Sequence, residues 1–380
     1  METNRKKKYA ELEECILDSI SFKKDERTLN QDNILLMQDL SKLPFGESHY
    51  ALPYLYLFKH LEQLGKIKQG DQVYENTSGS AGRAFIELAK LLEFNPHVAI
   101  PDGGEKARLK GLMDSMGSNY ELLYFDGTKE TIPIINKKRN SIIITPKEKY
   151  VNGFMDLVKP LLIKNLRNGT EIKFLNHSQG RKNDEINEAI IKGFSKYAKL
   201  AKTQAEKLGL PIDLYMAFVG NGSSLYGPAR EFAKSGIKTY AAEPAQAALA
   251  FDLLKKGVYK ELFGIEPGTL PRSRLPGGSF SIKGEHIPVP HISTPILEGL
   301  VEDILLISDR WTNKDYQNEL GESAREYFFN LARWDLSKYE DAGRTTRAAL
   351  AGAKELAKEV SGKNFLILKY DTMDKYDDQI

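Results

Sequence analysis

The sequence predicts an α/β protein made of two units, each with a parallel sheet flanked by helices. Short apolar runs alternate with stretches of helical periodicity along most of the 380 residues, which is the pattern of repeated βαβ units. The chain is also long enough to bury two cores of ordinary size. Two polar, glycine-containing turns each follow a predicted strand and open a helix, and ligands of such folds bind at the carboxyl ends of strands.

The smaller unit is predicted to span residues 46–154. Ahead of it, a helix is expected over residues 5–20, where Leu12, Ile16 and Ile20 recur every four positions. Residues 30–40 have no clear period, and residues 42–46 form a breaker with proline and glycine. The smaller unit is then expected to contain helices over residues 48–65 and 105–116, and strands over residues 73–74, 98–101, 121–125 and 142–144.

The larger unit is predicted to combine residues 1–45 with residues 155–380. Its expected strands are residues 172–175, 214–219, 239–242 and 365–368. Its expected helices are residues 185–208, 226–235, 246–256 and 348–360. Residues 257–295 are rich in glycine and proline, which predicts a long ordered loop over the crevice between the units.

Composition excludes several classes of site. The 54 Lys and Arg residues nearly balance 52 Asp and Glu residues, for a net charge of +2, so charge gives no reason to expect nucleic acid or membrane as a partner. The single cysteine, Cys15, rules out internal disulfides and cysteine-based zinc clusters and favours a reducing cytoplasm. The N-terminus continues into a charged amphipathic helix, and no apolar run is long enough to span a membrane. No metal site is predicted, since His286 and His291 are five apart in a proline-rich stretch and give weak evidence of ligation.

The first polar turn is a candidate anion site. Backbone N–H groups at a helix N-terminus are unpaired, and the helix dipole is positive there, so a carboxylate or phosphate would be held by several donors. The alternative is a hydroxyl cap that closes the helix and binds nothing. The candidate binding residues are Thr77, Ser78, Gly79, Ser80 and Gly82.

The second polar turn repeats this arrangement with more glycine. Two glycines let backbone N–H groups converge, and two hydroxyls follow them, which is a natural cradle for a phosphate. The alternative is a tight strand-to-helix turn without a ligand. Gly227, one turn into the helix, is expected to permit close packing. The candidate phosphate-binding residues are Gly220, Asn221, Gly222, Ser223 and Ser224.

Together the two turns resemble the fold-type II pyridoxal-phosphate enzymes, the cysteine synthase and tryptophan synthase β-subunit group. Residues 77–82 stand where that family has its Thr-Ser-Gly-Asn-Thr-Gly loop, which holds the substrate carboxylate, and residues 220–224 look like its phosphate loop. Residues 65–71 match the lead-in to the first loop, and residues 242–244 look like a Val-Glu-Pro segment. Residues 343–349 are similar to a Gly-x-Ser-Ser-Gly-Ala-Ala segment, which puts Thr345 at the pyridine nitrogen. Residues 362–371 are similar to the final strand, so the resemblance covers residues 40–375.

The resemblance implies a two-domain, tryptophan synthase β-like architecture and a homodimer. It implies pyridoxal phosphate as cofactor and β-elimination or β-replacement on an amino-acid-like substrate in the interdomain cleft. The family holds its cofactor through a lysine in a Gly-Ser-x-Lys-Asp-Arg segment, and residues 47–52 align there. Tyr50 then stands at the lysine position, or His49 if the register slips by one. Neither side chain forms a stable Schiff base.

Further departures concern the groups that contact the cofactor ring. Ser80 replaces the family asparagine, Ala81 replaces a threonine, and Arg347 replaces a glycine beside the pyridine nitrogen. The phosphate loop is kept, which favours a phosphate-bearing ligand other than covalently bound pyridoxal phosphate. Lysine-independent chemistry would use His49 and Tyr50 as general base and acid. Their alternative is a capped helix start with Tyr50 in the core.

Three functions therefore stay open. The first is a lyase or β-replacing transferase. The second is a catalytically altered homologue, a pseudoenzyme that binds a phosphorylated metabolite or the C-terminal carboxylate of a partner. The third is chemistry through His49 and Tyr50. Residues 176–178 lie near a segment that flanks the cofactor ring in the family, and they are predicted as a surface turn. Arg272 and Arg274 either reach an anionic substrate or are solvated.

Overall fold

The larger unit is built on a mixed sheet. The computed structural model describes residues 3–77, 79–102, 106–146, 154–177, 184–270, 275, 281–282, 285–286, 290–308, 320–334, 339 and 341–377. Within these residues the larger sheet has seven strands. Their order is β1 (Ser21–Asp25), β2 (Ile34–Asp39), β14 (Asn364–Lys369), β8 (Leu214–Phe218), β9 (Lys238–Pro244), β12 (Asp303–Ser308) and β13 (Ala332–Arg333).

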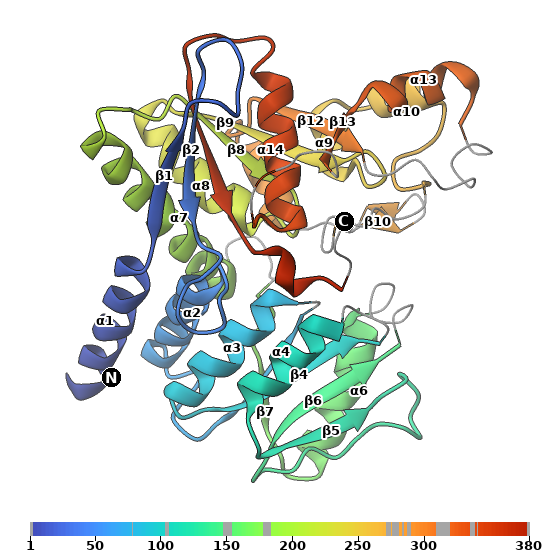
Figure 1. The fold of residues 1–380 in the computed structure, drawn as a ribbon. Coiled ribbons are helices and arrows are strands. Elements are labelled where there is room, and N and C mark those ends of the chain that lie inside the picture. The colour runs from blue at the N-terminus through green and yellow to red at the C-terminus, as the bar shows by residue number, and fades with distance from the viewer. Residues whose placement is uncertain are drawn as a thin grey trace.

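All pairs in this sheet are parallel except β1 with β2. Helix α14 (Arg344–Leu356) covers one face, and α7 (Glu185–Lys207) and α8 (Ser223–Phe232) lie on the other (Figure 1). Helices on both faces bury the parallel strands on both sides, as expected for this class.

The smaller unit holds a second, fully parallel sheet. In the described part of the chain its order is β5 (Tyr120–Tyr124), β6 (Asn140–Thr145), β4 (Asn95–Pro101), β3 (Gln72–Asn76) and β7 (Ile172–Phe174). Its helices are α2 (Ala51–Gln63), α3 (Ser80–Leu91), α4 (Lys106–Met116) and α6 (Phe154–Arg167). The expected α/β architecture with parallel sheets flanked by helices is confirmed.

Strand β7 differs from the expected boundary between the units. The sequence placed residues 172–175 with the larger unit, but β7 pairs with β3, with Ile172 opposite Gln72. The apolar pattern identifies a strand and says nothing about which sheet it joins. The smaller sheet therefore continues past residue 154, to the end of β7.

Strand β2 has no counterpart among the predicted elements. Its residues Ile34 to Met37 are consecutive apolar side chains, and the strand lies between β1 and β14 with its middle buried. A strand covered on both faces does not alternate between apolar and polar residues. That is why residues 30–40 show no period.

Glycines allow the helices between the units to approach closely. An added Cβ on Gly193 of α7 would lie 2.6 Å from Cα of Pro53 in α2. One on Gly227 of α8 would lie 2.7 Å from the carbonyl oxygen of Ile191 in α7. The close packing expected at Gly227 is confirmed.

The remaining elements complete the two units. Residues 257–295 contain helices and a short ribbon in their described part rather than loop alone. These further elements are α1 (Thr3–Asp18), α9 (Leu249–Leu254), α10 (Val258–Phe263), β10 (Ser281–Ile282), β11 (Glu285–His286), α11 (Pro290–Leu297), α13 (Glu322–Asn330) and the short 3-10 helices η1 (Ala233–Ser235) and η3 (Met373–Lys375).

The last described segment crosses from the larger unit to the smaller one (Figure 1). After β14, η3 leads to Asp377, whose carboxylate accepts the backbone N–H groups of Lys106 at 2.7 Å and Ala107 at 2.9 Å. These are first-turn amides of α4. Two guanidinium groups lie over the ring of Tyr376. That of Arg108 is 4.8 Å from the ring centroid, and that of Arg344 is 4.6 Å from it. We call residues 371–377 the C-terminal strap.

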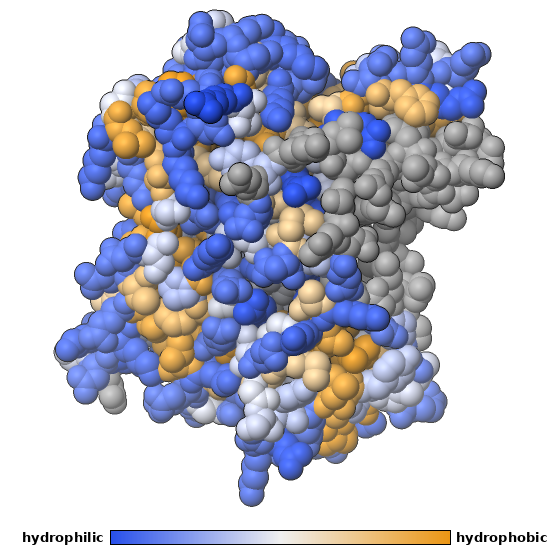
Figure 2. All heavy atoms as spheres, viewed as in Figure 1, coloured by the Kyte–Doolittle hydropathy of each residue, from blue (hydrophilic) through white to orange (hydrophobic). Residues whose placement is uncertain are grey.

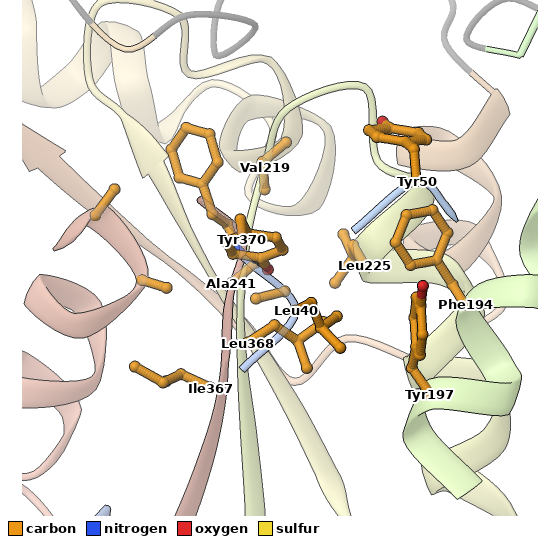
Figure 3. Close-up of a cluster of buried hydrophobic side chains, with 14 of the residues drawn as sticks. Leu40, Tyr50, Phe194, Tyr197, Val219, Leu225, Ala241, Ile367, Leu368 and Tyr370 are labelled. Carbon is orange, nitrogen blue, oxygen red and sulfur yellow. Dashed lines mark hydrogen bonds between the residues drawn. The ribbon is translucent and has the colours of Figure 1, made fainter. Parts of the chain in front are cut away.

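Aromatic side chains join the two units in the core. Tyr50, Phe194 and Tyr197 lie together beside Leu225 (Figure 3), and Tyr370 lies among the strands of the larger sheet. The face seen in Figure 2 is mostly hydrophilic, with apolar side chains in smaller patches. Over the described residues, no helix is long and apolar enough to cross a membrane.

Candidate active site

Both candidate anion loops begin at carboxyl ends of strands. Residues 77–82 connect β3 to α3, and residues 220–224 connect β8 to α8. Ser78 lies outside the described residues. The strands of both units direct these loops toward the boundary between the units, as the α/β architecture predicts.

The loop at residues 77–82, which we call the carboxylate loop, is tightly folded. The N–H of Thr77 donates to the carbonyl of Ala99 at 3.1 Å, and its Oγ1 accepts the N–H of Gly79 at 3.1 Å. An added Cβ on Gly82 would lie 2.5 Å from Cγ2 of Thr77. Helix α3 has no side-chain cap at Gly79, so the first-turn amide of Ser80 is available to an anion. The amide of Gly82 instead donates to the carbonyl of Gly79 at 3.0 Å.

Arg108 adds a positive charge to the carboxylate loop. An added Cβ on Gly79 would lie 2.3 Å from its Nη1, so the guanidinium packs directly against the loop. Arg108 also pairs with Asp371 of the C-terminal strap at 3.9 Å. Burial raises the pKa of the Asp371 carboxyl, while Arg108 acts in the opposite direction. Sequence reasoning missed Arg108, since the helix pattern of residues 105–116 does not show which side chain faces a distant loop.

The loop at residues 220–224, which we call the phosphate loop, has the geometry of an anion cradle. Gly222 has φ of +85°, a left-handed conformation that favours glycine. The side chain of Asn221 accepts the N–H of Ser223 at 3.1 Å. Among the described residues, the N–H groups of Gly220, Asn221 and Gly222 have no hydrogen-bond acceptor. Gly222 is buried, and a buried amide without an acceptor is costly unless an anion or water meets it.

Tyr50 links the phosphate loop to the smaller unit. Its hydroxyl accepts a hydrogen bond from Nδ2 of Asn221 at 2.8 Å. Its ring meets that of His177 edge-on, with centroids 5.1 Å apart, and packs against Phe194 (Figure 3). Burial raises the pKa of the Tyr50 hydroxyl well above its usual range. The tyrosine is therefore a neutral hydrogen-bonding group at neutral pH.

His49 lies beside Tyr50, with ring centroids 4.5 Å apart. Its Nδ1 is 3.1 Å from the carbonyl oxygen of Tyr370, to which it donates. That contact makes Nε2 the lone-pair nitrogen of the neutral ring. Burial lowers the pKa of His49 to about 3, so the side chain is neutral at physiological pH and is a hydrogen-bond acceptor there.

His177 is buried, which overturns the expected surface turn at residues 176–178. The side chain is only 5% exposed, and Ser178 lies outside the described residues. Nδ1 of His177 is 2.9 Å from the Tyr54 hydroxyl and 3.2 Å from Oε2 of Glu75. The backbone N–H of His177 also donates to Glu75 at 3.1 Å. Since β7 pairs with β3, the end of β7 lies beside the carboxylate loop, and the sequence did not show that pairing.

His291 meets the phosphate loop from helix α11. Its Nδ1 is 2.7 Å from Oγ of Ser223, and both side chains are almost completely buried. Burial lowers the pKa of His291 to about 3, and His177 acts in the same direction. The sequence offered this histidine only as a weak metal ligand. The described residues contain no group of three or more His, Cys, Asp or Glu side chains that could hold a metal ion.

Thr345 lies in the first turn of α14, beside the C-terminal strap. The neighbouring Thr346 accepts the N–H of Tyr370 at 3.0 Å through Oγ1. Arg347 folds back on its own turn, with Nε donating to the carbonyl of Ala342 at 2.8 Å. This hydrogen bond anchors the guanidinium to the backbone. Arg347 stands where the sequence comparison put a bulky cation beside the pyridine nitrogen of the cofactor.

Both almost fully buried lysines of the described chain are held by oxygen atoms. Among the described residues, Lys369 and Lys375 are the lysines that are almost fully buried. Lys369 pairs with Asp39 at 3.4 Å. Lys375, in the C-terminal strap, donates to the carbonyl of Glu47, just before Tyr50. Burial lowers the pKa of the Lys375 ammonium.

These groups fit the phosphate of pyridoxal phosphate and the carboxylate of an amino-acid substrate. The unpaired amides of residues 220–222 and the hydroxyls of Ser223 and Ser224 would hold the phosphate, and the first-turn amide of Ser80 would hold a carboxylate. Thr345 has a hydroxyl for a ring nitrogen. When bound, pyridoxal phosphate supplies an electron sink for the substrate's α-carbon.

Comparisons with known proteins agree with this architecture. No protein-family model matches the chain. A Saccharomyces cerevisiae protein that bears the provisional name of a mitochondrial cysteine synthase is 25% identical over 178 residues, which are 46% of this chain and 38% of that protein. The chain thus matches well under half of that protein's length.

Solved structures match over nearly the whole chain. A hydrogen sulfide-producing enzyme from Fusobacterium nucleatum has a TM-score of 0.63 at 18% identity, covering 95% of this chain and 96% of that one. An O-acetylserine-dependent cystathionine β-synthase from Helicobacter pylori has a TM-score of 0.62 at 17% identity, covering 96% of each. The chain therefore has the fold of the fold-type II pyridoxal-phosphate enzymes, the cysteine synthase and tryptophan synthase β-like group.

Proposed function

We propose that this protein binds an amino-acid-like substrate by its carboxylate and a phosphate-bearing ligand in one cleft, as a β-elimination or β-replacement enzyme. The observation that supports this most is the pair of anion loops joined by one aromatic cluster. Tyr50 contacts Asn221 of the phosphate loop and the ring of His177, and His177 lies beside the carboxylate loop.

The side chains divide the work between holding and proton transfer. Residues 77–82 and Arg108 hold the carboxylate, and residues 220–224 hold the phosphate. His49 offers a neutral Nε2 as a proton acceptor, while the neutral Tyr50 hydroxyl orients Asn221. The buried aromatic rings around them exclude water, which strengthens each polar contact in the cleft.

The test is addition of pyridoxal phosphate, followed by O-acetyl-L-serine and sulfide. This mechanism predicts a visible absorbance band, a lysine fixed by borohydride in peptide mass spectra, and formation of cysteine. Lys375 is the first peptide to inspect, because it is buried next to residue 47. A colourless protein with no fixed cofactor and no cysteine formed would contradict it.

A second candidate is a catalytically altered homologue that binds a phosphorylated metabolite or a partner's C-terminal carboxylate without pyridoxal phosphate chemistry. Tyr50 at the aligned lysine position supports it, together with the engaged Lys369 and Lys375. We expect phosphorylated small molecules to raise the melting temperature of the protein. This shift should be lost in the Gly222→Asp variant. Gly236→Asp is the matched control, because Gly236 also has positive φ but nothing lies within 4 Å of it. Equal shifts in both variants would count against this candidate.

Lysine-independent chemistry through His49 and Tyr50 is the third candidate. Its support is the position of both rings between the two loops. Any activity found without pyridoxal phosphate should be lost in His49→Ala and kept in His60→Ala, a partly exposed histidine on α2. We also propose a cytoplasmic homodimer, in keeping with a single cysteine and the usual symmetry of such proteins.

A further inference from the structure

A buried histidine of helix α11 lies against the start of helix α8 and has one unsatisfied ring nitrogen. Helix α8 has ten residues and begins at Ser223, whose side chain is fully buried. His291 is 1% exposed, and its Nδ1 is 2.7 Å from Oγ of Ser223. Its Nε2 is buried and has no hydrogen-bond partner in the described chain. A buried imidazole with one nitrogen unpaired is a group whose protonation responds to a new charge nearby.

The backbone holds this histidine against the phosphate loop. An added Cβ on Gly222 would lie 2.5 Å from both the carbonyl carbon and the carbonyl oxygen of His291, and 2.7 Å from N of Ile292. No space separates α11 from the loop. The imidazole therefore stays beside Ser223 unless the whole helix moves.

Among the described residues, few charged groups face His291. Helix α11 packs against α8 and α9. Helix α8 presents Ser223 and Tyr226, and the Tyr226 hydroxyl donates to Glu298 at 3.2 Å, just beyond α11. Helix α9 carries Asp252 in its first turn. His177 at the end of β7 is the titratable group that affects His291, and it disfavours a charge there.

We propose that His291 is the proton-binding partner of the phosphate loop, so that an oxyanion seated on residues 220–223 is bound together with one proton. Without the anion, the Ser223 hydroxyl donates to Nδ1, and the ring carries its hydrogen on Nε2. With the anion, that hydroxyl turns to donate to the anion. A proton from the buffer then forms a bond with Nδ1, and Nδ1–H donates to Oγ.

The physical cause is compensation of charge inside a dry site. An anion one hydroxyl away from the imidazole stabilises its cationic form, and the low local dielectric strengthens that attraction. The pKa of His291 is about 3 without the anion and rises when the anion binds. By linkage, anion affinity strengthens as pH falls, by up to about tenfold per pH unit between the two pKa values, and this gain is absent above the bound-state pKa.

The inference rests on the proposed function only in that the phosphate loop binds an oxyanion. The probe is sulfate, which carries no proton at neutral pH, so any proton taken up belongs to the protein. Calorimetric titration of the full chain at pH 6 to 8, in buffers of different ionisation enthalpy, gives the number of protons per sulfate. We expect uptake that approaches one proton at the lower pH, and affinity that falls as pH rises.

Two variants test whether His291 is the group that takes up the proton. His291→Gln should bind sulfate through the remaining amides without proton uptake and with an affinity that hardly changes with pH. His97→Gln is the matched control. His97 is another fully buried histidine whose pKa burial lowers to about 3, but it lies on β4 and contacts Ser141 and Gln72. This variant should keep the uptake of the unaltered protein.

The possible outcomes separate the role of His291 from anion binding by the phosphate loop. Sulfate binding without proton uptake in the unaltered protein overturns the role of His291 and leaves the phosphate loop intact. Uptake that persists in His291→Gln also overturns it, and points to another group of the cleft. Failure to bind sulfate, inorganic phosphate or pyridoxal phosphate overturns the phosphate loop itself, and the inference with it.

Discussion

Glu243 is a buried carboxyl that couples the stability of the larger unit to pH. Its carboxylate forms no ion pair with the described residues. It accepts hydrogen bonds from the N–H groups of Ala250 at 3.0 Å and Phe251 at 2.8 Å. Burial raises its pKa from an ordinary 4.5 to about 7. The folded state therefore keeps the Glu243 proton at pH values where the unfolded state has lost it. The contribution of Glu243 to stability is fully present below pH 4.5 and is lost as pH rises through about 7.

We expect Glu243→Gln to remove this pH dependence. Relative to the variant, the unaltered protein should lose roughly 3 kcal/mol of unfolding free energy between pH 5 and 8, as an order of magnitude. Urea unfolding at several pH values measures the difference. Buried His49, His97 and His291 act in the opposite direction below pH 6.5, and comparison with the variant cancels them. Parallel curves for the two proteins would exclude a role for Glu243.

At the residue scale, motifs within one segment were predictable and contacts across the chain were not. The strand–glycine–hydroxyl–helix pattern of residues 218–227 predicts the conformation at Gly222 from chemistry inside ten residues. The contact between Ser223 and His291 joins positions 68 apart. It depends on where α11 docks, which no local pattern encodes. His177 was misread for the same reason.

Among the elements, the interface of α7 and α8 depends on glycine. Gly227 has no room for a methyl group beside the carbonyl of Ile191, while Ser195 donates from Oγ to the Gly227 carbonyl at 2.8 Å. We expect Gly227→Ala to lower the unfolding free energy by about 1–3 kcal/mol through overpacking. Helix propensity alone predicts the opposite sign, a gain of up to about 1 kcal/mol. Chemical denaturation decides between them, and a stabilised variant would disprove the close contact.

Element type was easier to predict than element partnership. Strands with clear flanking turns, such as β8 and β14, were found because their apolar runs are short and bounded. Strand β12 was missed because it follows a stretch that reads as a long loop. The placement of β7 needed tertiary information, since a three-residue strand buries its side chains equally well at either sheet edge.

For the whole molecule, the C-terminal strap links the two units through α4. We expect Asp377→Ala to leave the amides of Lys106 and Ala107 without an acceptor and to speed hydrogen exchange in the first turn of α4. Asp374→Ala is the matched control, an exposed aspartate of the same segment. Exchange measured by mass spectrometry should differ between the variants. Equal protection of α4 in both would show that the strap does not hold this helix.

The sequence was sufficient for the two-unit architecture and its order of loops. It was not sufficient for how the units meet, because Tyr50, His177 and the strap become neighbours only when both sheets are in place. Such contacts join side chains from different units. They contribute to stability only after both units have folded, so the sequence pattern of a single element does not predict them.

The central position of β14 has a consequence for synthesis. This strand lies between β2 and β8, and its Asn364 pairs with Ile34. During synthesis, over three hundred residues are added after β2 before its parallel neighbour β14 exists, although its antiparallel neighbour β1 precedes it. The smaller sheet, in contrast, is complete once β7 has emerged. Long-range pairing of this kind is slow and leaves strand edges exposed. We expect the smaller unit to fold first, and nascent β2 and β8 to need protection from aggregation until the last strand closes the larger sheet.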